Sequence, residues 1–192
     1  MVPSAHASKT SDLLRRLDAA VANDDLHDLC RAVKQALTDT IAQGADFLAP
    51  SFLRPAPDRY ARRLLHRDPA GRYTIVVMVW DVGQGTPLHD HSGMWCVECV
   101  YQGRIRVTSF DLEGGPAAER IRFTPESVVM AGRGEAGHLI PPFEYHKIEN
   151  VDSAPAVTIH VYGGEMTSCT AFFPLDDGGY RREVRALSYT AA

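Results

Sequence analysis

Apolar residues recur at three- and four-residue steps through roughly the first forty positions, in two runs separated by a polar segment. This spacing places them on one side of a helix and predicts two amphipathic helices. The two stripes consist of Leu13, Leu14, Leu17, Ala20 and Val21, then Leu26, Leu29, Cys30, Val33, Leu37 and Ile41. Asn23 or Asp24 is placed to cap the second helix and Gly44 to end it. We therefore expect residues 1–50 to form a helical N-terminal extension packed on the rest of the chain.

Beyond the proline-rich stretch LAPSFLRPAPDRY, the pattern changes to short segments that alternate or are wholly apolar. They are rich in β-branched and aromatic residues and are separated by Gly, Pro and Asp. These segments are RYTIVVMVWDV, GMWCVECVYQG, RIRVTSFDL, SVVMAG and APAVTIHVYGG. Several short strands at near-regular spacing favour an antiparallel barrel or sandwich. We expect a mainly β protein in which residues 51–192 form one structural unit.

Composition narrows the classes of function. The 192 residues carry a formal net charge of -4, and no basic patch indicates a nucleic-acid partner. No apolar run is long enough for a membrane span, and the N-terminus lacks the apolar core of a secretory signal. Four cysteines without a regular framework indicate free thiols in a reducing, cytoplasmic setting. The oligomeric state stays open, a homo-oligomer included.

Two histidines, His89 and His91, stand one residue apart just before a strand-like run. Side chains two apart on a strand point to the same face, about 6–7 Å apart along the chain. Two imidazole nitrogens at this spacing can reach one metal ion from a rigid support. A bare His-x-His also arises by chance or as two rings that cap a loop, so the motif needs support from its surroundings.

The surroundings resemble the cupin superfamily, whose motifs are G-x5-H-x-H-x(3,4)-E-x6-G and a second motif ending in H-x3-N. The matching residues are Gly83, His89, His91, Gly103, His146 and Asn150. The resemblance implies a cupin-type antiparallel β-barrel (jelly roll) with His89, His91 and His146 as metal ligands. Cys96 stands where cupins have glutamate, and PPFEYH replaces the P-x-G of the second motif. His138 is an alternative third ligand, but the spacing to Asn150 favours His146.

The loss of the glutamate leaves an uncharged set of three histidines. Mononuclear, non-haem Fe²⁺ held by such a set keeps its full double charge and open positions, so an anionic thiolate can complete it. Cupins with this ligand set include the thiol dioxygenases. The expected partners are therefore a small-molecule thiol substrate and O₂.

In the segment APAVTIHVYGG, Thr158, His160 and Tyr162 alternate with apolar residues. A solvated outer face would give the same pattern. The cysteine dioxygenase family, however, carries a similar Ser-x-His-x-Tyr strand, and the resemblance implies a role for these three in managing protons. In some members the tyrosine is joined by a thioether to a cysteine at the position of Cys96, which implies a Cys96–Tyr162 crosslink. Residues three apart on a strand face opposite sides, so Cys99 should point away from Cys96. This spacing argues against a C-x-x-C metal or redox motif formed by the two cysteines.

The same family places a Tyr-x-Arg element upstream of the histidine pair, where the arginine binds the substrate carboxylate. Tyr60 and Arg62 match it, and an arginine fork suits both carboxylate oxygens. Arg63 leaves the register ambiguous by one residue, and surface charge is the ordinary role of such a pair. The 3-mercaptopropionate dioxygenases typically have glutamine at this position, although LLH and TPLHDH look similar to that branch.

The resemblance thus implies an iron-dependent thiol dioxygenase that adds both atoms of O₂ to the sulfur of a small thiol carboxylate. L-Cysteine, giving cysteine sulfinic acid, is the first choice of substrate and 3-mercaptopropionate the alternative. A cupin isomerase would usually retain the glutamate that Cys96 replaces. A non-catalytic cupin that binds a metal or small molecule would have no use for the pair His160 and Tyr162.

Overall fold

The computed structural model describes residues 5–44, 46–114, 120–142 and 144–191. Two helices come first, α1 (Ala5–Ala20) and α2 (Leu26–Ala42). The cap of α2 is Asp25 rather than Asn23 or Asp24, because Asp25 has the extended backbone and its carboxylate accepts the Asp28 N–H. Gly44 lies just beyond the helix with φ of 72°, which confirms the expected stop.

The remainder is a set of antiparallel strands in two sheets rather than one closed barrel. The first sheet has the order β1-β2-β9-β4-β7 and the second has the order β11-β10-β3-β8-β5-β6. The strands are β1 (Ala61–Arg67), β2 (Thr74–Trp80), β3 (Leu88–His89), β4 (Cys96–Gln102), β5 (Arg104–Glu113), β6 (Arg122–Gly132), β7 (Ala136–Leu139), β8 (Tyr145–Glu149), β9 (Ala156–Tyr162), β10 (Ser168–Pro174) and β11 (Tyr180–Ala186). A short 3₁₀ helix, η1 (Pro50–Leu53), precedes them. This is the mainly β, cupin-type architecture expected from the sequence.

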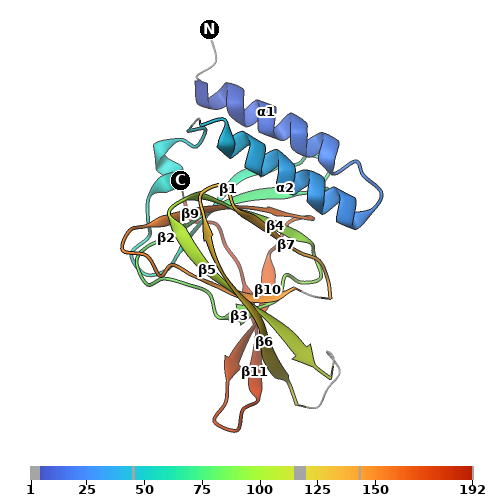
Figure 1. Ribbon diagram of the computed structural model, residues 1–192, viewed down its shortest axis with the longest axis vertical. Coiled ribbons are helices and arrows are strands. Elements are labelled where there is room, and N and C mark those ends of the chain that lie inside the picture. Colours follow the sequence, from blue (N-terminus) through green and yellow to red (C-terminus); the bar gives the residue numbers. More distant parts are fainter. Residues whose placement is uncertain (1–4, 45, 115–119, 143, 192) are drawn as a thin grey trace.

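The central strands of the first sheet are buried on both faces. Their outer residues, such as Val77 and Ile159, pack with α1 and α2 in one apolar cluster. Their inner residues, such as Met78 and Trp80, pack in a second cluster that faces the other sheet. Figure 1 shows the two helices lying side by side across the first sheet, while β6 and β11 extend away from them. The helices therefore pack against the outer face of the sheet whose inner face carries part of the candidate site.

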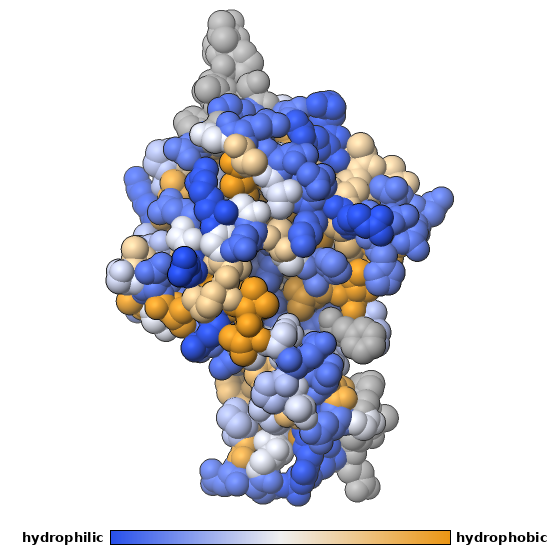
Figure 2. All heavy atoms as spheres, in the orientation of Figure 1, coloured by the Kyte–Doolittle hydropathy of each residue, from blue (hydrophilic) through white to orange (hydrophobic). Residues whose placement is uncertain are grey.

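The surface is hydrophilic over most of the helical layer in the view of Figure 2, with apolar patches lower on the strands. Among the exposed apolar residues are Val128, Val129 and Met130 on β6, an edge strand of the second sheet. Among the described residues, no helix is long and apolar enough to cross a membrane.

Three residues that match the cupin motifs stabilise the backbone conformation of turns. Gly83 and Gly103 have positive φ angles of 75° and 77°, which favour glycine. A Cβ on Gly103 would also approach the Ala156 backbone to 3.0 Å. The buried Asn150 amide donates to the carbonyls of Trp80 and Ala154 at 3.0 and 2.9 Å. These residues hold the turns next to the strands on which the histidines lie.

The burial of α2 predicts a stability effect that is separate from the site. Leu37 is fully buried between α2 and the first sheet. Leu37→Ala should therefore lower the free energy of unfolding by about 2–5 kcal/mol. Leu26→Ala, at the 37% exposed start of the same helix, is the matched control and should change it by about 0.5 kcal/mol or less. Urea denaturation measures both. Equal losses in the two variants would contradict the packing described for α2.

Candidate active site

Three histidines from separate segments meet inside the molecule. His89 lies on the two-residue strand β3 and pairs directly with His146 on β8, while His91 follows in the next turn. The ring centroids are 5.1 Å apart for His89 and His91, and 4.8 Å apart for each of the other two pairs. Their candidate ligand nitrogens all lie within 4.8 Å of one another. His138, the alternative ligand, is exposed on β7 and is not in this group.

The hydrogen bonds of the rings show which nitrogens are available. His89 Nδ1 lies 3.1 Å from the carbonyl oxygen of Pro87, and His91 Nδ1 lies 3.1 Å from that of Glu144. A carbonyl can only accept, so Nδ1 carries the proton in both rings and Nε2 keeps a free lone pair. Both nitrogens of the buried His146 lack a hydrogen-bond partner among the described residues.

Burial, followed by the charges of neighbouring histidines, holds the pKa of His91 and of His146 well below the usual range. Burial also lowers the pKa of His89. Three neutral imidazoles with converging lone pairs fit a divalent transition metal. The unpartnered nitrogens of His146 are what a ligand lacking its ion would leave, since buried polar atoms are rarely left unsatisfied.

The polar residues of β9 are all buried, so the pattern of a solvated outer face does not apply. Thr158, His160 and Tyr162 are 0%, 1% and 2% exposed. Trp80 Nε1–H donates to Thr158 Oγ1 at 2.9 Å, and Thr158 Oγ1 lies 2.8 Å from His160 Nε2. The arrangement that uses every hydrogen has the Thr158 hydroxyl donating to Nε2, which leaves the His160 proton on Nδ1.

Cys96 and Tyr162 are directly paired across β4 and β9. Both are buried, and burial raises the pKa of each well above its usual range, so they are a neutral thiol and a neutral phenol. The Tyr162 ring stacks on that of His160 at 5.9 Å and lies 6.1 Å from that of His91. Cys99 packs in the other apolar cluster, as its odd spacing from Cys96 implies.

Arg62 and Arg63 point to different surroundings. Arg63 donates from Nε to the Ala191 carbonyl at 3.1 Å, near the C-terminal end of the chain. Arg62 lines a cavity of about 380 Å³ with Tyr60 and His89. Tyr60 stacks on Trp80 at a centroid distance of 4.6 Å. Of the two arginines, Arg62 is therefore the one beside the histidine cluster.

The environment of Arg62 is unusual for a cation. Its side chain is only 4% exposed, and it forms no ion pair among the described residues. Nη2 donates to the Met166 carbonyl at 2.8 Å, whereas Nε has no partner. The guanidinium also lies 4.7 Å from the centre of the Tyr189 ring. A buried cation that forms no ion pair among the described residues and has a spare donor is a fitting place for an anionic group.

Sequence reasoning missed three residues of this region. Cys169 lines the Arg62 cavity, and burial raises its pKa to about 11. Tyr189 comes from the C-terminal segment, where no pattern links it to Arg62. Glu98 is a buried acid on β4, directly opposite His160. An acid on the inner face of the otherwise apolar CVECV run is a signal that could have revealed Glu98.

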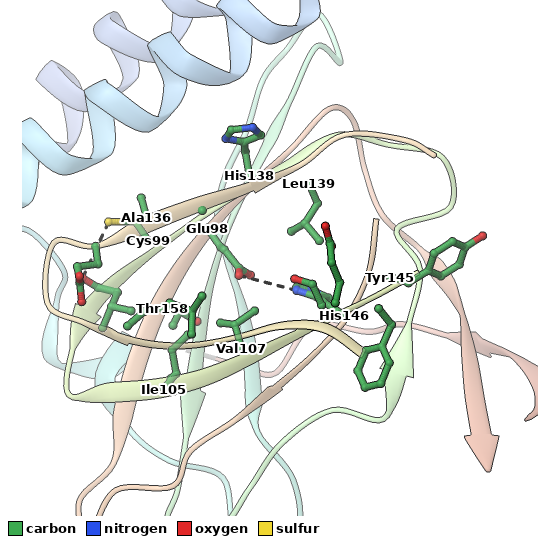
Figure 3. Close-up of a pocket in the computed structure, with 18 of the residues that line it drawn as sticks. Glu98, Cys99, Ile105, Val107, Ala136, His138, Leu139, Tyr145, His146 and Thr158 are labelled. Atoms are coloured by element: carbon green, nitrogen blue, oxygen red, sulfur yellow. Dashed lines mark hydrogen bonds and ion pairs between the residues drawn. The ribbon is translucent and has the colours of Figure 1, made fainter. Parts of the chain in front are cut away.

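Glu98 lies between two histidines. One carboxylate oxygen is 3.8 Å from His146 Nδ1 and the other is 3.6 Å from His160 Nδ1. Burial raises the pKa of Glu98 to about 8. Figure 3 shows Glu98 and His146 pointing toward each other at the lining of a cavity of about 450 Å³, with His138 pointing away from them. This cavity shares no lining residue with the Arg62 cavity.

The model of the family described as cysteine dioxygenase type I matches residues 3–174. The chain belongs to this family. Cysteine dioxygenase type 1 of Rattus norvegicus is 26% identical over 164 residues, which are 84% of this chain and 78% of the rat protein. That of Danio rerio is 27% identical over 115 residues, 59% of this chain and 56% of the fish protein. Membership identifies the chain as an oxygenase enzyme, and the resemblance inferred from its motifs is confirmed.

Similarity to individual solved structures is weaker. A cupin protein from Desulfovibrio desulfuricans, 18% identical, gives a TM-score of 0.45 and covers 62% of this chain and 94% of its own. A structural similarity this weak assigns no function to any residue. The assignment of the cysteine dioxygenase family therefore depends on the sequence match.

The three converging histidines should be needed for metal binding. His89→Ala should lower iron affinity at least about tenfold, because one of three converging nitrogens is removed. His138→Ala is the matched control and should bind iron like the unaltered protein, because His138 lies outside the cluster. Anaerobic iron titration followed by metal analysis measures both. Normal affinity in His89→Ala, or a loss in His138→Ala, would contradict the ligand set.

Cys96 and Tyr162 lie opposite each other on neighbouring strands. Their direct cross-strand pairing should allow a thioether to form when the iron-loaded protein is exposed to O₂ and thiol. Forming one C–S bond removes a hydrogen from the thiol and another from the ring, and O₂ takes up both. Peptide mass mapping should therefore show a joined peptide lighter by two hydrogens than its parts. Cys96→Ser should abolish it, and its absence from the unaltered protein after turnover would refute the crosslink.

Proposed function

We propose that this enzyme is a mononuclear non-haem iron thiol dioxygenase whose substrate is L-cysteine and whose product is cysteine sulfinic acid. In this reaction both atoms of O₂ are added to the substrate sulfur. The observation that carries the substrate class is Arg62, a buried guanidinium that forms no ion pair within the described part of the chain and lines the same cavity as His89. A small carboxylate carrying a thiol would supply the missing negative charge while its sulfur lies near the histidines.

His89, His91 and His146 would hold the iron through their free Nε2 atoms. Iron bound there would supply the redox chemistry that lets O₂ react with a thiol sulfur. Among the described residues, no acidic side chain joins this cluster, which favours a substrate that brings its own negative charge as a thiolate. The neutral state of the three rings suits this role, because only neutral imidazole offers a lone pair.

The other residues would orient the substrate. Arg62 can grip both carboxylate oxygens, and the Tyr60 ring, stacked on Trp80, closes one side of the cavity. Tyr162 presents a phenol whose raised pKa keeps it protonated and able to donate. Its neighbour His160 is held by Thr158. Fixing the thiol beside the site of oxidation is the main contribution asked of these groups.

The charge on Arg62 should decide which thiols are accepted. Arg62→Gln should raise KM for cysteine about 10- to 100-fold, because it removes a charge-assisted pair worth about 1.5–3 kcal/mol. Turnover of cysteamine, a thiol without a carboxylate, should change little. Arg63→Gln is the matched control and should behave like the unaltered enzyme, because Arg63 binds the Ala191 carbonyl instead.

The rate of oxygen uptake, measured in parallel with cysteine, cysteamine and 3-mercaptopropionate, gives KM and turnover for each variant. Equal effects of Arg62→Gln on cysteine and cysteamine would show that Arg62 does not anchor the carboxylate. A higher kcat/KM for 3-mercaptopropionate than for cysteine would assign the enzyme to the amine-free substrate. No uptake with any thiol would overturn the proposed function.

A further inference from the structure

The three candidate ligands are supported in different ways behind the metal site. His89 and His91 each direct Nδ1 at a backbone carbonyl oxygen, 3.1 Å away in both cases. His146 Nδ1 has no such carbonyl and faces the carboxylate of Glu98 at 3.8 Å. Histidine ligands in metal sites almost always donate their second nitrogen to an acceptor, which fixes the ring. Glu98 occupies the place of that acceptor for His146.

Glu98 itself lacks partners that its burial would demand. Glu98 is only 6% exposed, and its Oε2 atom has no hydrogen-bond partner among the described residues. Leaving a buried polar group unpaired costs about 1–3 kcal/mol, and more if it is charged. His146 Nδ1 is likewise unpartnered. The oxygen that faces His146 Nδ1 is Oε1, 3.8 Å away, and a relative shift of about 1 Å brings these two atoms to hydrogen-bond length and satisfies the histidine nitrogen. The unpartnered Oε2 faces His160 Nδ1 instead.

The location of Glu98 separates it from the missing cupin glutamate. That position holds Cys96, and Glu98 is two residues further along the same inner face of β4. There its carboxylate approaches Nδ1 of His146, the nitrogen on the far side of the ring from Nε2. Glu98 is also absent from the cluster of converging ligand atoms. It therefore lies behind a ligand rather than among the ligands.

We propose that Glu98 is a positioning residue for the metal site: its carboxylate accepts the Nδ1–H of His146 and so directs Nε2 at the metal. The same carboxylate faces His160 Nδ1 at 3.6 Å, which is the nitrogen that the Thr158 contact leaves protonated. One acid thus connects the third ligand with the histidine beside Tyr162. This inference rests on the metal site of the proposed function, but not on the identity of the thiol.

Two properties of the metal should follow from this contact. An oriented ring with one fixed tautomer binds the ion more tightly, and loss of such an outer partner typically costs about 10- to 100-fold in affinity. The negative charge that Glu98 carries above its pKa of about 8 also favours the ferric over the ferrous state, so the potentials are compared at pH 9. Removing the charge while keeping an acceptor should therefore raise the midpoint potential with a smaller effect on affinity.

The experiment compares Glu98→Leu, which removes the acceptor, with Glu98→Gln, which keeps an acceptor but loses the charge. Glu126→Gln is the matched control, because Glu126 lines the same cavity and forms no ion pair with a histidine among the described residues. Anaerobic iron titration against a chelator gives affinity without thiol or O₂, and redox titration gives the potential. Thermal melting of each metal-free variant reports folding. Affinity should fall about 10- to 100-fold in Glu98→Leu and only a few-fold in Glu98→Gln, whose potential should rise.

Affinity in Glu98→Leu within twofold of the unaltered protein would overturn the inference, as would an equal loss in Glu126→Gln. If Glu98→Leu fails to fold, Glu98→Gln decides: an unchanged affinity together with an unchanged potential also overturns it. These readouts do not involve substrate. An enzyme inert toward thiols would refute the proposed function but leave the Glu98 result standing. Normal metal binding by Glu98→Leu would refute the role of Glu98 but leave the proposed function standing.

Discussion

The convergence of three buried, uncharged imidazoles is the constraint on which the rest of this structure depends. Bringing His89, His91 and His146 together requires a two-residue strand, β3, to be held between β10 and β8. So short a strand has little pairing of its own, and its place is fixed by the sheet around it. The glycine turns, the Asn150 amide and the helical layer behind β2, β9 and β4 all limit how far this region can move. Burial then lowers the pKa of each ring and keeps its lone pair free for a metal.

Much of this arrangement could be predicted from local spacing. Helical periodicity located both helices, and strand alternation placed Thr158, His160 and Tyr162 on one face. The alternation could not tell whether that face met solvent or the interior, since this depends on the second sheet. The one-residue ambiguity between Arg62 and Arg63 likewise needed the register of β1 against β2, and the C-terminal contacts of each arginine. Two sheets rather than a closed barrel also follow from long-range pairing that no short pattern contains.

The largest omission was the buried acid. The replacement of the cupin glutamate by Cys96 indicated an uncharged site, and that remains true of the converging ligand atoms. Glu98 nevertheless returns a carboxylate to the region, one layer further out and facing His146. The carboxyl group thus lies behind one of the candidate ligands rather than among them. On the other side, Arg62 provides a buried positive charge in a separate cavity. The Glu98 carboxyl group and the Arg62 guanidinium lie near different candidate ligands, His146 and His89, so each can act on its own part of the site.

The two-sided burial of β9 has a consequence for folding fidelity. Its even-numbered residues, Thr158, His160 and Tyr162, face the site, while its odd-numbered residues pack beneath the helices. Because side chains alternate strictly, a slip of one residue would drive all three polar groups into a hydrocarbon layer and turn the valines and isoleucine toward the histidines. Such a misaligned chain would lose core packing and bury unpaired polar atoms at once. The strand that carries three candidate site residues is therefore one whose misregistration is strongly disfavoured, and correct assembly of the sheet and of the candidate site becomes a single event.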